Sequence, residues 1–359
     1  MRSFPPSMVR SPPISAARLR IHPRAGSSLR LAARPITTSL PHRDASASPS
    51  TPSPGKPQLP LGTPSPTEAP PAPLAAVPAP RLFDLTNRTV IVAGAARGLG
   101  LTVARAFLEA GAHVQALDLL PKPDEPAWSQ TQKVAADRGV TLTYGTLDVT
   151  DQQQVHDVFE KCFDAAPTNA PVRGLFVSAG IQLMIDAIDY PADQFRKLID
   201  VNLTGTFLCA QAFAREWTSR NPNSTEAVEK AEHSVSTGNT ASIVMTASMS
   251  GSVANRGINA APYNASKAGV VQLGRNLAME WGERGIRVNT LSPGYIRTAL
   301  TAKLLQDRPD FNELWLGGSL LGRLSTPDEF RGPAIFMLSD ASSFMTGADL
   351  IVDGGHTAT

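Results

Sequence analysis

Twelve consecutive residues carry the strongest fold signal in the chain: Thr89-Val90-Ile91-Val92-Ala93-Gly94-Ala95-Ala96-Arg97-Gly98-Leu99-Gly100. A β-branched run leads directly into a glycine-rich turn, and an apolar-periodic segment, 101–110, follows, so the order is strand, turn, helix. Glycines let the backbone approach a pyrophosphate, which sits at the positive end of the following helix. We therefore predict a dinucleotide turn with contacts from Gly94, Arg97, Gly98, Leu99 and Gly100. The spacing is G-x-x-x-G-x-G, and a turn without a ligand is the alternative.

A second predicted strand, 113–118, ends in the carboxylate of Asp118, 18 residues after Gly100. A carboxylate there accepts hydrogen bonds from the adenosine ribose and repels a 2′-phosphate. Arg97 favours the opposite outcome, because a guanidinium attracts that phosphate. The carboxylate acts more directly, so we expect NAD as the cofactor, with NADP as the alternative.

Further apolar strands are predicted at 141–149, 174–180, 242–248, 287–294 and 349–354, and helices at 128–138, 151–165, 192–218, 262–283 and 326–338. This alternation predicts an α/β fold, a doubly wound Rossmann-type parallel sheet of about seven strands with helices on both faces. Ligands of such sheets bind at the carboxyl ends of the strands. Polar or glycine residues stand at four of these ends, namely Asp148, Ser178-Ala179-Gly180, Ser248 and Pro293-Gly294.

The net charge of +2 hides an asymmetry between the two parts of the chain. Residues 1–80 hold nine basic and two acidic residues, and the remaining 24 basic and 29 acidic residues give the rest of the chain a charge of −5. An acidic body does not favour nucleic-acid binding. Two cysteines exclude a disulfide scaffold, and no apolar run is long enough to span a membrane.

The N-terminal region has a composition unlike that of the rest. Residues 1–43 hold eight arginines and no acidic residue, which is typical of a mitochondrial transit peptide directed to the matrix. The alternative is a basic tail without an address, which would leave the protein cytoplasmic. Residues 44–80 are rich in Pro, Ser and Ala, and 19 of the 31 prolines precede residue 81, so we predict a disordered linker. One folded domain is then expected over 81–359.

Tyr263 and Lys267 lie four residues apart at the start of the predicted helix 262–283. That spacing places them on one helix face, where a nearby ammonium favours the phenolate. We therefore expect Tyr263 to exchange protons near neutral pH. Taken alone, the pair is also compatible with an ordinary amphipathic helix.

Taken together, these motifs make residues 81–359 resemble the short-chain dehydrogenase/reductases. Ala93–Gly100 is similar to the family's T-G-x-x-x-G-x-G, Ser178-Ala179-Gly180 to its N-A-G, and Tyr263 with Lys267 to its Y-x-x-x-K. The resemblance also covers Asp148-Val149 at the adenine contact, Asn202 as the catalytic asparagine, and Pro293-Gly294 with Ile296 and Thr298 over the nicotinamide. Ala93 and Ser178 depart from the family pattern.

The resemblance implies hydride transfer between a nicotinamide and a secondary alcohol or ketone, without a metal. It implies that Tyr263 is the general acid/base, that Lys267 lowers its pKa and holds the ribose, and that Asn202 holds a water. It also implies a serine that binds the substrate oxygen. Ser250 has the common family spacing of 13 residues before Tyr263, whereas Ser248 ends the strand three residues before Gly251, and we choose Ser248.

The substrate is less well specified. The segments 180–182 and 189–195 are similar to fungal polyol and ketose reductases of the arabinitol type, and Gln182 is a candidate to bind a polyhydroxylated substrate. Residues 300–321 predict a mobile lid with an apolar face formed by Phe311, Leu314, Trp315 and Leu316, which also suits the acyl chain of a 3-oxoacyl-carrier-protein reductase.

Two further expectations concern partners and class. The resemblance implies a homotetramer or homodimer packed through helices 192–218 and 262–283. A non-catalytic nucleotide sensor or assembly subunit is the alternative of another class, and the presence of Asn202, Tyr263 and Lys267 favours an enzyme. Residues 218–241 fit no regular element and are expected to form a surface insertion.

Overall fold

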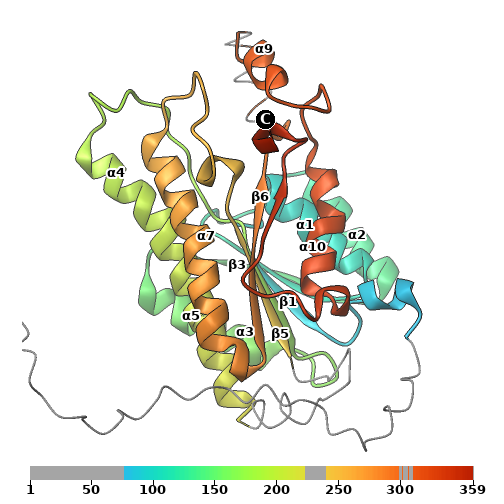
Figure 1. Cartoon of the computed structure of the whole chain (residues 1–359). Coiled ribbons are helices and arrows are strands. Elements are labelled where there is room, and N and C mark those ends of the chain that lie inside the picture. Colours follow the sequence, from blue (N-terminus) through green and yellow to red (C-terminus); the bar gives the residue numbers. More distant parts are fainter. Residues whose placement is uncertain (1–76, 223–239, 299–300, 302–305, 307–309, 359) are drawn as a thin grey trace, which may run out of the picture. The chain divides into compact units, whose positions relative to one another are not determined.

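The computed structural model describes residues 77–222, 240–298, 301, 306 and 310–358. Residues 1–76, which hold the proposed transit peptide (1–43) and most of the proposed linker (44–80), lie outside the described part of the chain. Residues 223–239 of the predicted insertion 218–241 also lie outside it. The body forms one sheet with helices on both faces, as predicted (Figure 1).

All seven strands run parallel, in the order β3-β2-β1-β4-β5-β6-β7. Their bounds are β1 Thr89–Ala93, β2 His113–Asp118, β3 Leu142–Thr146, β4 Val172–Val177, β5 Ala241–Thr246, β6 Ile286–Pro293 and β7 Asp349–Val352. The chain winds outward in both directions from β1, so the order reverses between β1 and β4. Ligands of open parallel sheets bind at such a reversal.

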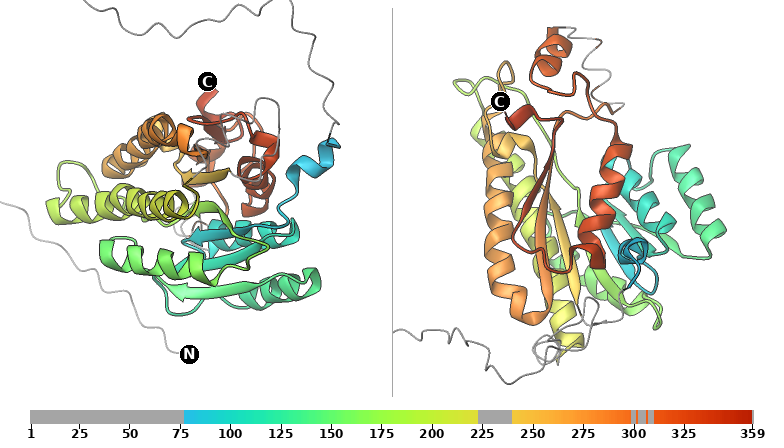
Figure 2. Two further views of the ribbon diagram at one scale, coloured as in Figure 1. Left: turned by 90° about the horizontal axis from the view of Figure 1, so that it is seen from below. Right: turned by 45° about the vertical axis from the view of Figure 1, so that its right-hand side comes forward.

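The α-helices are α1 Gly98–Glu109, α2 Ala127–Arg138, α3 Gln152–Ala165, α4 Ala192–Ile199, α5 Gly205–Arg220, α7 Ala261–Trp281, α9 Asp310–Gly317 and α10 Arg331–Leu338. Helices α3, α5 and α7 cover one face of the sheet, and α1, α2 and α10 cover the other (Figure 2). Strand β1 explains the two layers. Val90 and Val92 point into the core under α1, and Ile91 and Ala93 into the core under α5.

Several predicted bounds were wrong, for identifiable reasons. The predicted strands 141–149, 174–180 and 242–248 end two to three residues earlier, because the chain turns there to form the ligand-binding edge. The predicted helix 192–218 is divided by a π-helical turn, Asp200–Thr204. The predicted helix 326–338 opens with a short 3₁₀ turn, Pro327–Phe330, which Thr326 and Glu329 cap. The predicted lid contains helix α9.

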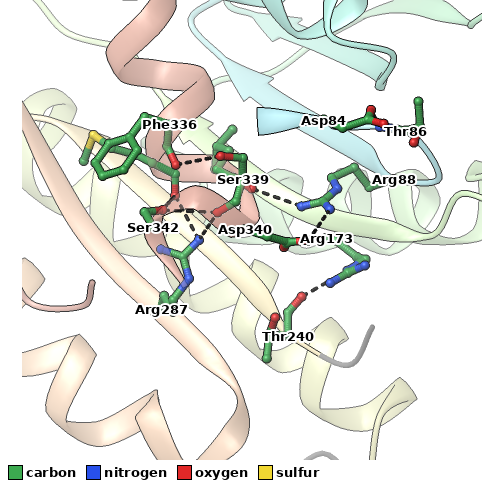
Figure 3. A network of polar contacts seen from close by, with 12 residues as sticks. Asp84, Thr86, Arg88, Arg173, Thr240, Arg287, Phe336, Ser339, Asp340 and Ser342 are labelled. Carbon is green, nitrogen blue, oxygen red and sulfur yellow. Dashed lines mark hydrogen bonds and ion pairs between the residues drawn. The ribbon is translucent and has the colours of Figure 1, made fainter. Parts of the chain in front are cut away.

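A polar network closes the amino ends of the strands (Figure 3). Arg88 and Arg287 donate hydrogen bonds to the last carbonyls of α10, Leu338 O at 3.2 Å and Met337 O at 3.0 Å respectively, and Arg88 also pairs with Asp340 at 3.5 Å. Cations at the negative end of a helix are stabilising. The amino-terminal edge of the sheet therefore anchors the C-terminus of α10.

Candidate active site

The glycine turn between β1 and α1 brings three backbone segments together. A Cβ on Gly100 would lie 1.9 Å from the carbonyl oxygen of Gly94, and a Cβ on Gly94, whose φ is +87°, would lie 2.4 Å from the nitrogen of Ala179. Gly98 also has a positive φ, +56°, but its missing Cβ faces open space. Gly94 and Gly100 are thus required for close packing, whereas Gly98 needs only its backbone conformation.

The first turn of α1 is free of side chains that compete for its N–H groups. Its N-cap residue, Arg97, makes no side-chain capping bond, and the turn contains no acidic residue. The first N–H groups of a helix need partners and carry the positive end of the dipole. This donor set fits a pyrophosphate, so the predicted contacts of Gly98, Leu99 and Gly100 lie where that anion would bind.

Asp118 lies at the end of β2, beside the glycine turn. Its two carboxylate oxygens accept hydrogen bonds from the backbone of Ala96 at 2.9 Å and Leu120 at 3.1 Å. Burial first, and then the negative charges of Asp118 and Asp124, raise the pKa of the neighbouring Tyr144 to about 12. No sequence pattern indicated that Asp124 lies near this site. The place expected for the adenosine ribose is therefore negatively charged, while the Arg97 side chain is exposed.

The residues after β3 and β4 form the next part of this edge. Asp148 accepts hydrogen bonds from the backbone and hydroxyl of Thr150, at 2.9 and 2.7 Å, so it braces the turn in which Val149 is buried. Ala179 donates its backbone N–H to Ala93 at 3.1 Å. A Cβ on Gly180 would lie 3.3 Å from Asn202 Oδ1 and 3.6 Å from Lys267 Nζ, so β4 ends beside both residues.

Asn202 is fully buried in the π-helical turn. Its Oδ1 accepts a hydrogen bond from the Ile181 amide at 2.8 Å, and its Nδ2 donates to Ile181 O at 2.9 Å and to Ser266 Oγ at 3.1 Å. The side chain thus ties the end of β4 to helix α7. Ser266 was missed in the sequence, although it lies directly before Lys267.

Ser248, Tyr263 and Lys267 meet at the start of α7. Ser248 lies close enough to the Tyr263 hydroxyl to lower its pKa. Lys267 Nζ lies 5.7 Å from the centre of the Tyr263 ring and donates to Thr246 O at 2.7 Å. Ser250 donates its backbone N–H to Ser248 Oγ at 3.2 Å, and of the two serines only Ser248 affects the Tyr263 pKa.

The expectation that the pKa of Tyr263 is lowered was wrong. Burial raises the pKa of Tyr263, and the Ser248 hydrogen bond lowers it only in part. Burial also lowers the pKa of Lys267 to about 8. The sequence shows the spacing of the pair but not its burial, and burial disfavours the charged form of each group.

The remaining predicted contacts are spread around this centre. Ile296 forms a β-bridge with Ser325, and Thr298 donates its backbone N–H to Thr301 Oγ1 at 2.7 Å. Gln182, the candidate substrate residue, is exposed beyond β4. All three lie on segments that follow strand ends, but the structure gives them no direct bond to Tyr263.

The predicted apolar face of the lid exists, and it is packed. Phe311 and Trp315 form a cluster with Leu324, against which Leu314, Leu316, Ile258 and Tyr295 pack. Tyr295 stacks on Trp315, with ring centres 4.4 Å apart and planes 6° apart, and its hydroxyl accepts a hydrogen bond from Asn255 at 3.3 Å. Tyr295 and Asn255 were missed, because they are 40 residues apart and no sequence pattern joins them.

Two negative findings apply to the described part of the chain. It contains no group of three or more His, Cys, Asp or Glu side chains arranged to hold a metal ion. It also contains no helix with the length and apolar character needed to cross a membrane.

Comparisons with known proteins agree with this geometry. A family model described as enoyl-(acyl carrier protein) reductase matches residues 94–357. A relative from Aspergillus versicolor, named short chain dehydrogenases/reductase notP′, is 50% identical over 77% of this chain and 89% of its own. A galactitol 2-dehydrogenase (L-tagatose-forming) of Cereibacter sphaeroides is 36% identical over 77% of this chain and 97% of its own.

Two further matches name sugar-related substrates. A D-arabinitol 2-dehydrogenase (ribulose-forming) of Candida tropicalis is 33% identical over 76% of this chain and 94% of its own. The crystal structure of a gluconate 5-dehydrogenase from Burkholderia cenocepacia J2315, in complex with NADP and tartrate, is similar with a TM-score of 0.65 and 30% identity, covering 77% of this chain and 98% of that one.

Proposed function

The chain belongs to the short-chain dehydrogenase/reductase family, and from this premise we propose that it interconverts a secondary alcohol of a polyol and the corresponding ketose. It is an NAD(P)-dependent oxidoreductase, similar to polyol and sugar-acid dehydrogenases. The observation that carries the proposal is the grouping of Ser248, Tyr263 and Lys267, with Lys267 Nζ 5.7 Å from the Tyr263 ring centre, at the same sheet edge as the uncapped start of α1.

The nicotinamide cofactor supplies the hydride acceptor or donor when it is bound. Gly94 to Gly100 would hold its pyrophosphate, and Asp118 its adenosine ribose. Tyr263 exchanges the proton with the substrate oxygen, and Ser248 donates a hydrogen bond that fixes this oxygen. A raised tyrosine pKa keeps the phenol protonated at neutral pH. This is the form needed to donate a proton to a ketone.

Lys267 would hold the nicotinamide ribose with an ammonium that stays charged below its pKa of about 8. Asn202 has a positioning role in this proposal. Its amide fixes the end of β4 against α7, and it thereby keeps Gly180 and Lys267 close together. We also propose that Asn202 holds a water molecule, as the family resemblance implies.

The polyol assignment is supported by the names of the two dehydrogenases and by the match over 97% and 94% of their own lengths. The second candidate is a 3-oxoacyl-carrier-protein reductase, which shares only the acyl-carrier-protein substrate with the description of the matching family, enoyl-(acyl carrier protein) reductase. The apolar side chains that suited an acyl chain, Phe311 and Trp315, are however buried against the protein itself. This leaves the polyol as the preferred substrate class.

The test is a nicotinamide absorbance assay of the purified full chain with D-arabinitol, galactitol, L-xylulose and a 3-oxoacyl thioester. We expect turnover with a polyol or ketose. Turnover confined to the thioester would support the second candidate, and tight cofactor binding without any turnover would favour a nucleotide sensor. Each substrate is assayed with both cofactors, and we expect faster rates with NAD because Asp118 and Asp124 repel a 2′-phosphate.

We also propose a homo-oligomer that packs through α5 and α7. These helices line a groove of about 1160 Å³ whose walls are largely apolar, including Leu203, Phe207, Leu273, Leu277 and Trp281. A second copy of the chain is the occupant that family resemblance implies. Light scattering should give a dimer or tetramer, and Leu273→Arg, a partly exposed position, should shift the mass to the monomer.

Residues 1–43 remain a proposed mitochondrial transit peptide. A fluorescent fusion of the full chain should enter mitochondria, and deletion of 1–43 should leave it in the cytoplasm. Identical cytoplasmic distributions would exclude the address.

A further inference from the structure

Near the start of α7, hydrogen bonds fix the orientations of three side chains, those of Asn264, Asn255 and Tyr295. Asn264, the residue after Tyr263, donates from Nδ2 to Val253 O at 3.0 Å and to Asn255 Oδ1 at 3.2 Å. A backbone carbonyl can only accept, so the NH₂ group of Asn264 must face Val253. The same NH₂ group then requires an acceptor from Asn255, which fixes Oδ1 of Asn255 toward it.

The fixed amide of Asn255 determines the role of Tyr295. With Oδ1 used, Asn255 Nδ2 donates to the Tyr295 hydroxyl oxygen at 3.3 Å. The oxygen of Tyr295 is therefore an acceptor in this bond, and its own proton points elsewhere. No acceptor for that proton is found among the residues that the structure describes. Burial raises the pKa of Tyr295, which keeps the hydroxyl protonated and able to donate.

The Tyr295 ring is held on two sides. Trp315 stacks on it in parallel, and His356 contacts it edge-on with ring centres 5.3 Å apart. The indole N–H of Trp315 is buried and, within the described residues, has no partner. A buried donor without an acceptor costs free energy, so the Trp315 N–H and the Tyr295 O–H are two donors that an acceptor from outside the cluster can use. The cluster joins α9, which carries Phe311 and Trp315, to Tyr295, which follows β6. Figure 1 shows α9 beyond the carboxyl end of β6.

We propose that Tyr295 is a specificity-determining residue whose O–H donates a hydrogen bond to a second oxygen of the substrate, one that does not react. Asn255 and Asn264 are positioning residues that turn this proton toward the substrate. The site then selects a polyhydroxylated substrate over an alcohol with a single oxygen. This inference rests on the proposed function, because it assigns the second contact of the same site.

The first test compares D-arabinitol with 2-pentanol, which has the same number of carbons and one hydroxyl. Tyr295→Phe keeps the aromatic ring and removes only the donor. KM for D-arabinitol should rise roughly fivefold to tenfold, the value of one neutral hydrogen bond, with kcat little changed. The kinetics with 2-pentanol should not change. Equal effects on the two alcohols, or no effect, would overturn the inference.

The second test keeps the hydroxyl and reverses its proton. In Asn255→Asp the carboxylate has no N–H to donate, so it accepts from both Asn264 and the Tyr295 hydroxyl. The proton of Tyr295 then points away from the substrate, and KM for D-arabinitol should rise as in Tyr295→Phe. A structural role for the tyrosine ring alone predicts no such rise. Ser242→Ala, which removes a buried 2.8 Å bond to Met337 O at the opposite end of β5, is the control and should leave both KM values unchanged.

A binding measurement separates this inference from the proposed function. If the wild type turns over none of the polyols and ketoses of the panel, the proposed function fails, and D-arabinitol and 2-pentanol are then titrated while tryptophan fluorescence is recorded. Trp315 stacks on Tyr295 and reports binding there. Tighter binding of D-arabinitol that Tyr295→Phe abolishes would support the donor role, and equal or absent binding would overturn it.

Discussion

Lys267 should reduce the stability of the fold that contains it. The residue is 5% exposed, and burial lowers its pKa from 10.5 to about 8. A shift of this size corresponds to about 3 kcal/mol, because each unit is about 1.4 kcal/mol. Below pH 8 both the folded and the unfolded chain carry the proton, and the folded chain bears the full cost. Between pH 8 and 10.5 only the unfolded chain binds the proton, so stability rises with pH and the cost disappears.

Lys267→Met removes the charge and keeps most of the side-chain volume. It also removes the hydrogen bond to Thr246 O, a loss of about 1 kcal/mol. At pH 7 the variant should therefore be more stable than the wild type by about 2 kcal/mol, although it should be inactive. By pH 10.5 the gain should be absent or reversed.

Urea unfolding of both proteins, at one protein concentration and at pH 7 and pH 10.5, measures these differences. Lys197→Met, at an exposed lysine of α4, is the control and should change little at either pH. A variant that is less stable than the wild type at pH 7, or a difference that does not depend on pH, would refute the reasoning.

Two further predictions concern the cofactor. Asp118→Asn removes the carboxylate that we propose binds the adenosine ribose, and it should raise kcat/KM with NADP relative to NAD by roughly tenfold. Initial rates with the two cofactors measure this, and an unchanged ratio would contradict the proposed selectivity. Gly100→Ala places a methyl group 1.9 Å from Gly94 O, so cofactor affinity should fall by about a hundredfold or the domain should lose roughly 3 kcal/mol of stability. Gly98→Ala, whose Cβ meets open space, should cost about 1 kcal/mol, and equal effects at the two glycines would contradict the packing argument.

The sheet could be predicted from local patterns. The run Thr89–Ala93 is apolar on both faces, as a central parallel strand requires, and the glycines that follow mark the turn. The division of the segment 192–218 could not be predicted, because its apolar period continues through Asn202 without Gly or Pro before Gly205. In this turn Asn202 bonds to Ile181, in the segment after β4, and to Ser266 of α7, and both partners lie far from it in the sequence.

The candidate site could likewise be predicted only in part from the sequence. The four-residue spacing of Tyr263 and Lys267 is a property of one helix, and the sequence displays it directly. The direction of the Tyr263 shift depends on burial by other elements, so it was predicted wrongly. The contact of Asn255 with Tyr295 joins two loops across the fold, and only the structure reveals it.

The central claim is that the Tyr263 hydroxyl transfers the proton that accompanies hydride transfer. The most direct measurement is the turnover of Tyr263→Phe with the best substrate of the panel, together with the dissociation constant of the cofactor from the same preparation. If Tyr263 transfers this proton, kcat should fall roughly a thousandfold while cofactor binding stays unchanged. A variant that binds the cofactor and retains near-wild-type turnover would contradict it.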